Sequence, residues 1–242
     1  MLLVVLSMPA QTIAATILVV GDSLSAAYGI PIQTGWVALL QQRLKARGFS
    51  HHVVNASVSG DTTANGLERL PQALSKHRPA IVIIELGGND GLRGLSLTQM
   101  QHNIATMITK AHAQNAQVLL VGVFLPPNYG RAYIEKFRSV YRELAARFEI
   151  PLVPFLLERV ATRTDLMQGD GIHPTAQAQP IMLDNVWPYL VPFLTGKQSQ
   201  TPAQRSDLPA LRVAPSPGAF FGTINLLLSS WVPGIFHGII ER

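Results

Sequence analysis

A serine near the amino terminus and an aspartate–histidine pair far along the chain are the side chains best suited to chemistry. Ser23 lies in the run Gly-Asp-Ser-Leu-Ser at 21–25, and Asp170 and His173 lie in Asp-Gly-Ile-His-Pro at 170–174. A serine hydroxyl is a weak nucleophile until a base removes its proton. On a tight turn, Asp170 can accept from Nδ1 of His173, which leaves Nε2 free to act as that base. Each run alone is also typical of an ordinary turn, so the hypothesis depends on their combination.

Two glycine-containing segments can supply the hydrogen-bond donors that acyl transfer needs. Gly60 lies in Ser-Gly-Asp at 59–61, where the missing side chain lets a backbone N–H approach a ligand. Asn89 lies in Gly-Gly-Asn-Asp at 87–90 and offers a side-chain amide. One such donor to a tetrahedral intermediate is commonly worth about 3 kcal/mol. Each segment alone is equally compatible with a glycine-rich turn.

The hydrophobic pattern predicts the elements that position these residues. Short apolar runs predict strands at 16–20, 52–55, 80–86, 118–123 and 152–153. Helical spacing predicts intervening helices at 35–47, around 67–74, at 97–111 and at 134–148, and a last helix after Pro174. Continuous apolar strands between amphipathic helices indicate an α/β fold whose parallel sheet is covered on both faces. Ligands bind beyond the carboxyl ends of such strands, where Ser23, Gly60 and Asn89 are expected.

Four motif blocks, in this order, resemble the SGNH (GDSL) hydrolase family. They are GDSLS at 21–25, Gly60 in ASVSGDT, Asn89 in GGND, and DGIHP at 170–174. The resemblance covers roughly residues 16–194. The runs VVNASVSGDT, ELGGNDGLRG and LPPNYGRAY are similar to the bacterial periplasmic acyl-CoA thioesterase I, lysophospholipase and arylesterase group.

The resemblance implies a flavodoxin-like three-layer α/β/α sandwich with a parallel five-stranded sheet. It implies Ser23 as the nucleophile, His173 as the base and Asp170 as the residue that orients it. The oxyanion hole would consist of the N–H of Ser23, the N–H of Gly60 and the amide of Asn89. The expected reaction is hydrolysis of small-molecule acyl esters or thioesters through an acyl-enzyme, with no metal and no cofactor.

A segment after the third strand is expected to bind substrate. It matches a part of the related proteins that shapes the acyl groove, and comprises Gly91, Leu92, Arg93, Gly94, Leu95 and Ser96. The two glycines predict mobility. Tyr129, in the segment 128–131, lines the acyl site in one interpretation and belongs to a plain strand-to-helix loop in the other.

Composition excludes several other classes of function. The chain carries a formal charge of +5 without a Lys/Arg-rich run, so we predict no nucleic-acid partner. It has no cysteine, which excludes disulfides, a cysteine nucleophile and cysteine-ligated zinc. The remaining histidines lack the spacing of a metal site.

The ends of the chain differ from the expected hydrolase domain at 16–196. Residues 1–15 are apolar and uncharged, which indicates a secretory signal or an N-terminal extension, and hence a periplasmic or secreted protein. Residues 197–217 predict a flexible linker, and 218–242 form an apolar tail. The tail is a membrane-surface anchor, a partner-binding segment or a sequence accident. Two prolines, Pro188 and Pro192, predict that the last domain helix ends early or kinks.

Two alternatives to an enzyme remain open. One is a non-catalytic acyl- or lipid-binding module on the same fold, although all five candidate catalytic positions are present. The other is a membrane-tethered protein whose tail provides its main role. We expect a monomer in either case.

Overall fold

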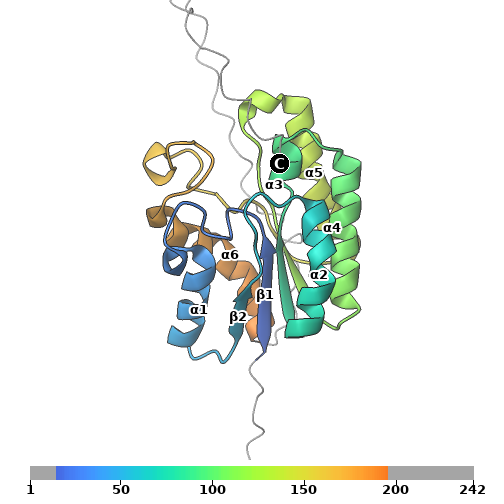
Figure 1. Ribbon diagram of the computed structural model, residues 1–242, viewed down its shortest axis with the longest axis vertical. Coiled ribbons are helices and arrows are strands. Elements are labelled where there is room, and N and C mark those ends of the chain that lie inside the picture. Colours follow the sequence, from blue (N-terminus) through green and yellow to red (C-terminus); the bar gives the residue numbers. More distant parts are fainter. Residues whose placement is uncertain (1–14, 196–242) are drawn as a thin grey trace, which may run out of the picture. The chain divides into compact units, whose positions relative to one another are not determined.

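The computed structural model describes residues 15–195 (Figure 1). The predictions for residues 1–14 and for the linker and tail beyond 196 concern residues outside this range. The strands are β1 Thr16–Gly21, β2 His52–Asn55, β3 Ile81–Glu85, β4 Gln117–Val121 and β5 Leu152–Val153. The helices are α1 Trp36–Ala46, α2 Thr63–His77, α3 Gly88–Leu92, α4 Leu97–His112, α5 Arg131–Phe148 and α6 Gln179–Leu194. Short 3-10 turns lie at Ile32–Thr34, Pro127–Tyr129, Thr164–Leu166 and Ala176–Ala178.

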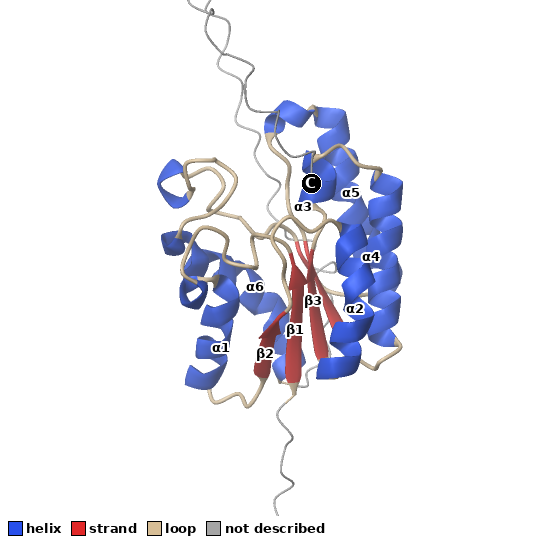
Figure 2. Ribbon diagram, viewed as in Figure 1, coloured by secondary structure: helices blue, strands red, loops and turns tan. Residues whose placement is uncertain are grey.

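The five strands form one parallel sheet in the order β2-β1-β3-β4-β5. Helices α1 and α6 cover one face, and α2, α4 and α5 cover the other (Figures 1 and 2). This strand order is the flavodoxin-like one, in which successive strands are added on opposite sides of β1, so the strand order reverses between β1 and β3. The predicted three-layer sandwich is therefore confirmed.

Alternating side chains of the central strands supply both halves of the core. Leu18 and Val20 of β1 pack toward α2, α4 and α5, whereas Ile17 and Val19 pack toward α1 and α6. All four are fully buried. Burying one such side chain contributes about 1.5–3 kcal/mol, so this strand firmly fixes the position of the turn that follows it.

The predicted early end of α6 is wrong because the helix ends at neither proline, whereas the predicted kink stays a prediction. The helix continues through Pro188 and Pro192 to Leu194. Pro188 lacks the N–H that would bond to the carbonyl of Asp184, and both residues are exposed, so water can solvate that carbonyl. The buried face of the helix holds it in place, through Met182, Leu183, Val186 and Leu190.

Between residues 15 and 195, no helix is both long enough and apolar enough to span a bilayer.

Candidate active site at the carboxyl edge of the sheet

The three predicted donor and nucleophile segments follow three adjacent strands. Ser23 comes two residues after β1, Gly60 lies in the loop after β2, and Asn89 lies at the start of α3 after β3. Because β2, β1 and β3 are neighbours, their loops lie together beyond one edge of the sheet (Figure 2). The site therefore occupies the point where the strand order switches.

A chain of two hydrogen bonds joins the predicted nucleophile, base and orienting carboxylate. Nε2 of His173 lies 2.9 Å from Oγ of Ser23, although the two residues are 150 positions apart. Nδ1 of His173 lies 2.6 Å from Oδ2 of Asp170. Oδ1 of Asp170 also accepts from the N–H groups of Ile172 and His173, at 2.9 and 3.0 Å. The fold thus brings together the three residues in the geometry that a serine nucleophile requires.

The charge on Asp170 selects the tautomer of the histidine. Burial alone would raise the pKa of Asp170. The hydrogen bonds that its carboxylate accepts from the backbone and ring of His173 and from the Ile172 N–H outweigh burial and lower this pKa to about 2. The carboxylate is therefore ionised at neutral pH and favours a proton on Nδ1. That leaves Nε2 of His173 as an acceptor for the Ser23 proton.

Two residues that sequence analysis missed hold His173 in place. The ring of Tyr28 packs against the imidazole with centroids 4.4 Å apart and planes inclined by 39°. Gln168 donates from Nε2 to the carbonyls of Tyr28 and Pro174, and its N–H donates to the carbonyl of His173 at 2.7 Å. The contacts of Tyr28 join segments far apart in the chain, so no local spacing could have indicated them, whereas Gln168 lies five residues before His173, outside the DGIHP motif.

Two backbone amides of the predicted oxyanion hole are available. Within the described part of the chain, the N–H groups of Ser23 and Gly60 donate to no protein acceptor. Gly60 adopts φ of 84°, a conformation that favours glycine. Its carbonyl accepts from Arg93 at 3.0 Å, and the next residue, Asp61, pairs with Arg69 at 2.6 Å. Both arginines therefore fix the loop that carries the Gly60 donor.

The amide of Asn89 points its nitrogen at the nucleophile turn. Nδ2 donates to the carbonyl of Asp61 at 3.0 Å and to Oδ2 of Asp22 at 3.2 Å. Asp22 directly precedes Ser23, so the predicted side-chain donor lies beside the predicted nucleophile. The arrangement matches an oxyanion hole that draws on three different loops.

Two buried carboxyl groups lie behind the nucleophile. Asp22 is 2% exposed and Glu85 is fully buried, and Oγ of Ser25 donates to Oε2 of Glu85 at 2.6 Å. Burial raises the pKa of Asp22 to about 6, and burial together with the charge of Asp22 raises that of Glu85 well above its ordinary value. At neutral pH, Asp22 therefore carries a charge, whereas burial shifts Glu85 toward its protonated form. One acidic residue within the apolar strand AIVIIEL was the available indication of this pair.

The segment expected to be a mobile acyl-site loop is partly helical. Gly91 and Leu92 belong to α3, which sequence analysis did not predict. A Cβ on Gly91 would lie 2.6 Å from both Leu125 and Phe137, so close packing explains this glycine. Ser96 caps α4 by accepting from the N–H of Gln99.

Two tyrosines attach this segment to the start of α5. Tyr129 donates to the carbonyl of Leu92 at 2.9 Å, and Tyr133 donates to that of Gly91 at 3.3 Å. The fold therefore places Tyr129 beside the predicted acyl segment. Tyr133 was not among the predicted residues.

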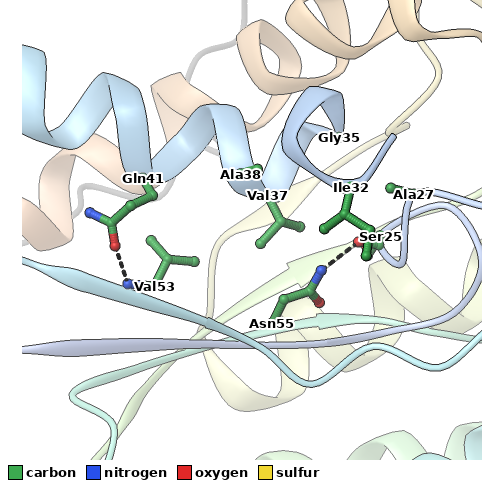
Figure 3. A pocket seen from close by; sticks show the side chains of 9 residues that line it. All are labelled: Ser25, Ala27, Ile32, Gly35, Val37, Ala38, Gln41, Val53 and Asn55. Atoms are coloured by element: carbon green, nitrogen blue, oxygen red, sulfur yellow. Dashed lines mark hydrogen bonds between the residues drawn. The ribbon is translucent and has the colours of Figure 1, made fainter. Parts of the chain in front are cut away.

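A separate cavity of about 110 Å³ lies between α1 and β2 (Figure 3). Its lining is mostly apolar and comprises Ser25, Ala27, Ile32, Gly35, Val37, Ala38, Gln41, Val53 and Asn55. The polar groups at its ends already bond to protein, Asn55 to the carbonyl of Ser25 and Gln41 to the N–H of Val53. Neither Ser23 nor His173 lines this cavity, so we do not assign the reaction to it.

Comparisons with known proteins identify the family of this chain. The model of the GDSL-like lipase/acylhydrolase family matches residues 19–180. Esterase TesA of Pseudomonas aeruginosa is 57% identical over 76% of this chain and 92% of its own length. Thioesterase 1/protease 1/lysophospholipase L1 of Escherichia coli K12 is 44% identical over 74% of this chain and 85% of its own.

A solved esterase structure is also similar to this chain. The esterase EstA of Pseudoalteromonas sp., described as inhibited by monoethylphosphonate, is 39% identical, with a TM-score of 0.71 over 74% of this chain and 98% of its own. The family model covers the segments of both Ser23 and His173, and the resemblance drawn from the four motifs is confirmed. The chain belongs to the GDSL-like lipase/acylhydrolase family.

Proposed function

We propose that the protein hydrolyses acyl esters and thioesters through an acyl-enzyme formed on Ser23. The observation that carries this proposal is the hydrogen-bonded chain from Ser23 through His173 to Asp170. The names of its relatives, esterase and thioesterase/lysophospholipase, support the same class of bond.

In the first half of the cycle, Oγ of Ser23 attacks the acyl carbonyl carbon while Nε2 of His173 takes its proton. The carbonyl oxygen becomes an oxyanion and accepts from the N–H groups of Ser23, Gly60 and Asn89. Asp170 remains ionised and stabilises the imidazolium that forms. Each hydrogen bond strengthens as charge develops, which lowers the barrier rather than only binding substrate.

In the second half, His173 gives its proton to the leaving alcohol or thiol as the acyl carbon–heteroatom bond breaks. Water then attacks the acyl group on Ser23 and transfers a proton to His173. Collapse of the second tetrahedral intermediate releases the carboxylic acid and returns the proton to Ser23. The same residues therefore serve both halves of the reaction.

The acyl chain is proposed to contact the segment 91–96 together with Tyr129. The support is that Tyr129 bonds to Leu92 and that both segments follow strands at the edge where Ser23 lies. A hydrophobic groove discriminates each methylene by only about 1–3 kcal/mol, so we expect a broad range of chain lengths. A panel of acyl-CoAs, lysophospholipids and aryl esters would measure this range.

A periplasmic or secreted location, with membrane contact through the tail, completes the proposal. Its support is the apolar character of residues 1–15 and 218–242. Fractionation of cells that express the full chain tests the location. Liposome binding, with and without residues 197–242, tests the tail.

Ser23→Ala tests the proposed reaction directly. We expect hydrolysis of a chromogenic short-chain ester to fall by at least about 10⁴-fold, because loss of the nucleophile removes the covalent route. Ser139→Ala on α5 is the matched control and should keep the full rate. An undiminished rate in Ser23→Ala would refute the proposal, and fatty-acid binding without turnover in the unsubstituted protein would favour a binding module.

A further inference from the structure

Asp22 connects the nucleophile turn to the loop that carries Asn89. Oδ1 accepts from the N–H of Leu24 at 3.0 Å, and Oδ2 accepts from Nδ2 of Asn89 at 3.2 Å. The side chain is 2% exposed, so both oxygens have protein donors and little access to water. One carboxylate therefore holds together segments that follow β1 and β3 and lie 67 residues apart.

We propose that Asp22 is a positioning residue for the oxyanion hole, which turns the N–H groups of Asn89, rather than its oxygen, toward Ser23. This inference depends on the proposed function of Ser23. The two ends of an asparagine amide have nearly the same shape, so packing alone does not choose between them. Acceptors around the amide make the choice, and the two beside Nδ2 are Oδ2 of Asp22 and the carbonyl of Asp61.

The two acceptors have different parts in the reaction. The bond from Asn89 to the carbonyl of Asp61 is 3.0 Å long and the bond to Oδ2 of Asp22 is 3.2 Å long, so both lie within the normal range. Asp22 directly precedes Ser23, so an oxyanion that forms on the Ser23 adduct can share the N–H that points toward Asp22. Asp22 thus keeps this donor oriented before the reaction, as a preorganised oxyanion hole requires.

The electrostatic surroundings of Asp22 support its proposed role in orienting Asn89. Burial is the main reason that its pKa rises to about 6, while the Leu24 N–H, His173 and Asn89 lower it and Asp61 raises it. A pKa of about 6 leaves Asp22 charged at neutral pH, whereas burial and the charge of Asp22 raise the pKa of the neighbouring Glu85. A charged oxygen is a stronger acceptor than a neutral one, which favours the observed orientation of Asn89.

Asp22→Asn is nearly isosteric but removes one acceptor. Asparagine has one acceptor oxygen, whereas Asp22 uses both of its oxygens. If the oxygen of the new amide side chain at position 22 accepts from the Leu24 N–H, its NH2 group faces the NH2 group of Asn89. If that oxygen accepts from Asn89 instead, the NH2 group of residue 22 faces the N–H of Leu24. Since the site is buried, the loss falls on one of these two contacts in either case.

A double-mutant cycle with Asn89→Ala tests whether Asp22 acts through Asn89. We expect Asp22→Asn to lower kcat by about 10- to 100-fold in the unsubstituted protein, below the 10²–10³-fold typical of a lost oxyanion donor, with little change in KM. In the Asn89→Ala background it should lower kcat by no more than about twofold. Equal factors in both backgrounds would overturn the inference while leaving the Ser23→Ala result, and hence the proposed function, intact.

A second pair of variants measures the contact without relying on activity or on the folding of Asp22→Asn. Asn89→Asp places two carboxylates against each other and should lower Tm. Adding Asp22→Asn to it restores one donor and one acceptor, so we expect Tm to recover by several degrees while kcat stays at the level of Asn89→Ala. A double variant no more stable than Asn89→Asp would show that residues 22 and 89 do not interact as proposed.

Discussion

The exposed turn that carries Asp170 and the buried site behind the nucleophile use the same chemical group in opposite ways. Asp170 is ionised because backbone and ring N–H groups surround it, and its pKa falls to about 2 despite partial burial. Glu85 is buried beneath the nucleophile turn, where loss of water and the nearby charge of Asp22 raise its pKa and favour its protonated form. The environment, rather than the residue type, therefore decides which carboxyl groups carry charge.

The two regions also differ in how they are built. The bonds of Asp170 go to residues two and three positions away, so a five-residue run contains most of the turn. Asp22 also bonds to a residue 67 positions away and Glu85 to one 60 positions away, and these two bonds exist only after the sheet has formed. We expect substitutions in the turn to affect the rate, and substitutions in the buried site to affect folding as well.

The largest effect in this comparison is expected for Asp170→Asn. Asparagine can present an N–H to Nδ1 of His173 and favour the wrong tautomer, so kcat should fall by about 10³- to 10⁴-fold. Steady-state kinetics on a chromogenic ester would measure it. The control is Asp165→Asn, a few residues before Asp170, which removes the charge of an exposed partner of Arg163 and should leave kcat unchanged. A loss of less than tenfold in Asp170→Asn would mean that the turn does not orient the base.

An intermediate effect is expected for stability when Glu85 is truncated. Glu85→Ala removes the acceptor of the Ser25 hydroxyl and leaves a cavity, which should cost on the order of 2–4 kcal/mol of unfolding free energy. Glu85→Gln resembles the protonated acid and should cost less than about 1 kcal/mol. Urea denaturation of both variants would test this. Equal losses would show that the glutamate is ionised in the folded protein.

The smallest effect concerns the pH dependence of stability. The pKa of Glu85 is higher in the folded protein than its ordinary 4.5, so the folded state binds the extra proton and stability falls as pH rises above about 4.5. The raised pKa of Asp22 likewise makes stability fall as pH rises from about 4 to about 6. Glu85→Gln should flatten the slope of unfolding free energy against pH by up to about 1.4 kcal/mol per pH unit at pH 5–6. An unchanged slope would contradict a raised pKa for Glu85.

Local features of the sequence indicated more than the non-local ones. Apolar runs and helical spacing located the five strands and the long helices, because these patterns depend on neighbouring residues. The motifs also indicated Ser23, His173 and Asp170, which the fold brings together. Helix α3 was missed because its glycines resemble a turn, and packing against Leu125 and Phe137 overrides that preference.

The supporting residues could not be found from spacing. Tyr28 reaches His173 through a ring contact that depends on the tertiary arrangement, whereas Gln168 bonds to His173 within the same turn but lies outside the DGIHP motif. The prolines of α6 suggested an early end or a kink, and the buried face of the helix prevents the early end. In each case, tertiary contacts outweigh local preference.

Covalent labelling of the folded protein tests the central claim most directly. An alkyl phosphonate ester that reacts with serine nucleophiles should modify the protein once, on Ser23, with loss of its leaving group and of esterase activity together. Peptide mass spectrometry would locate the adduct, and Ser23→Ala should remain unlabelled. An adduct on Ser25 or elsewhere that abolishes activity while Ser23 stays free would contradict the account.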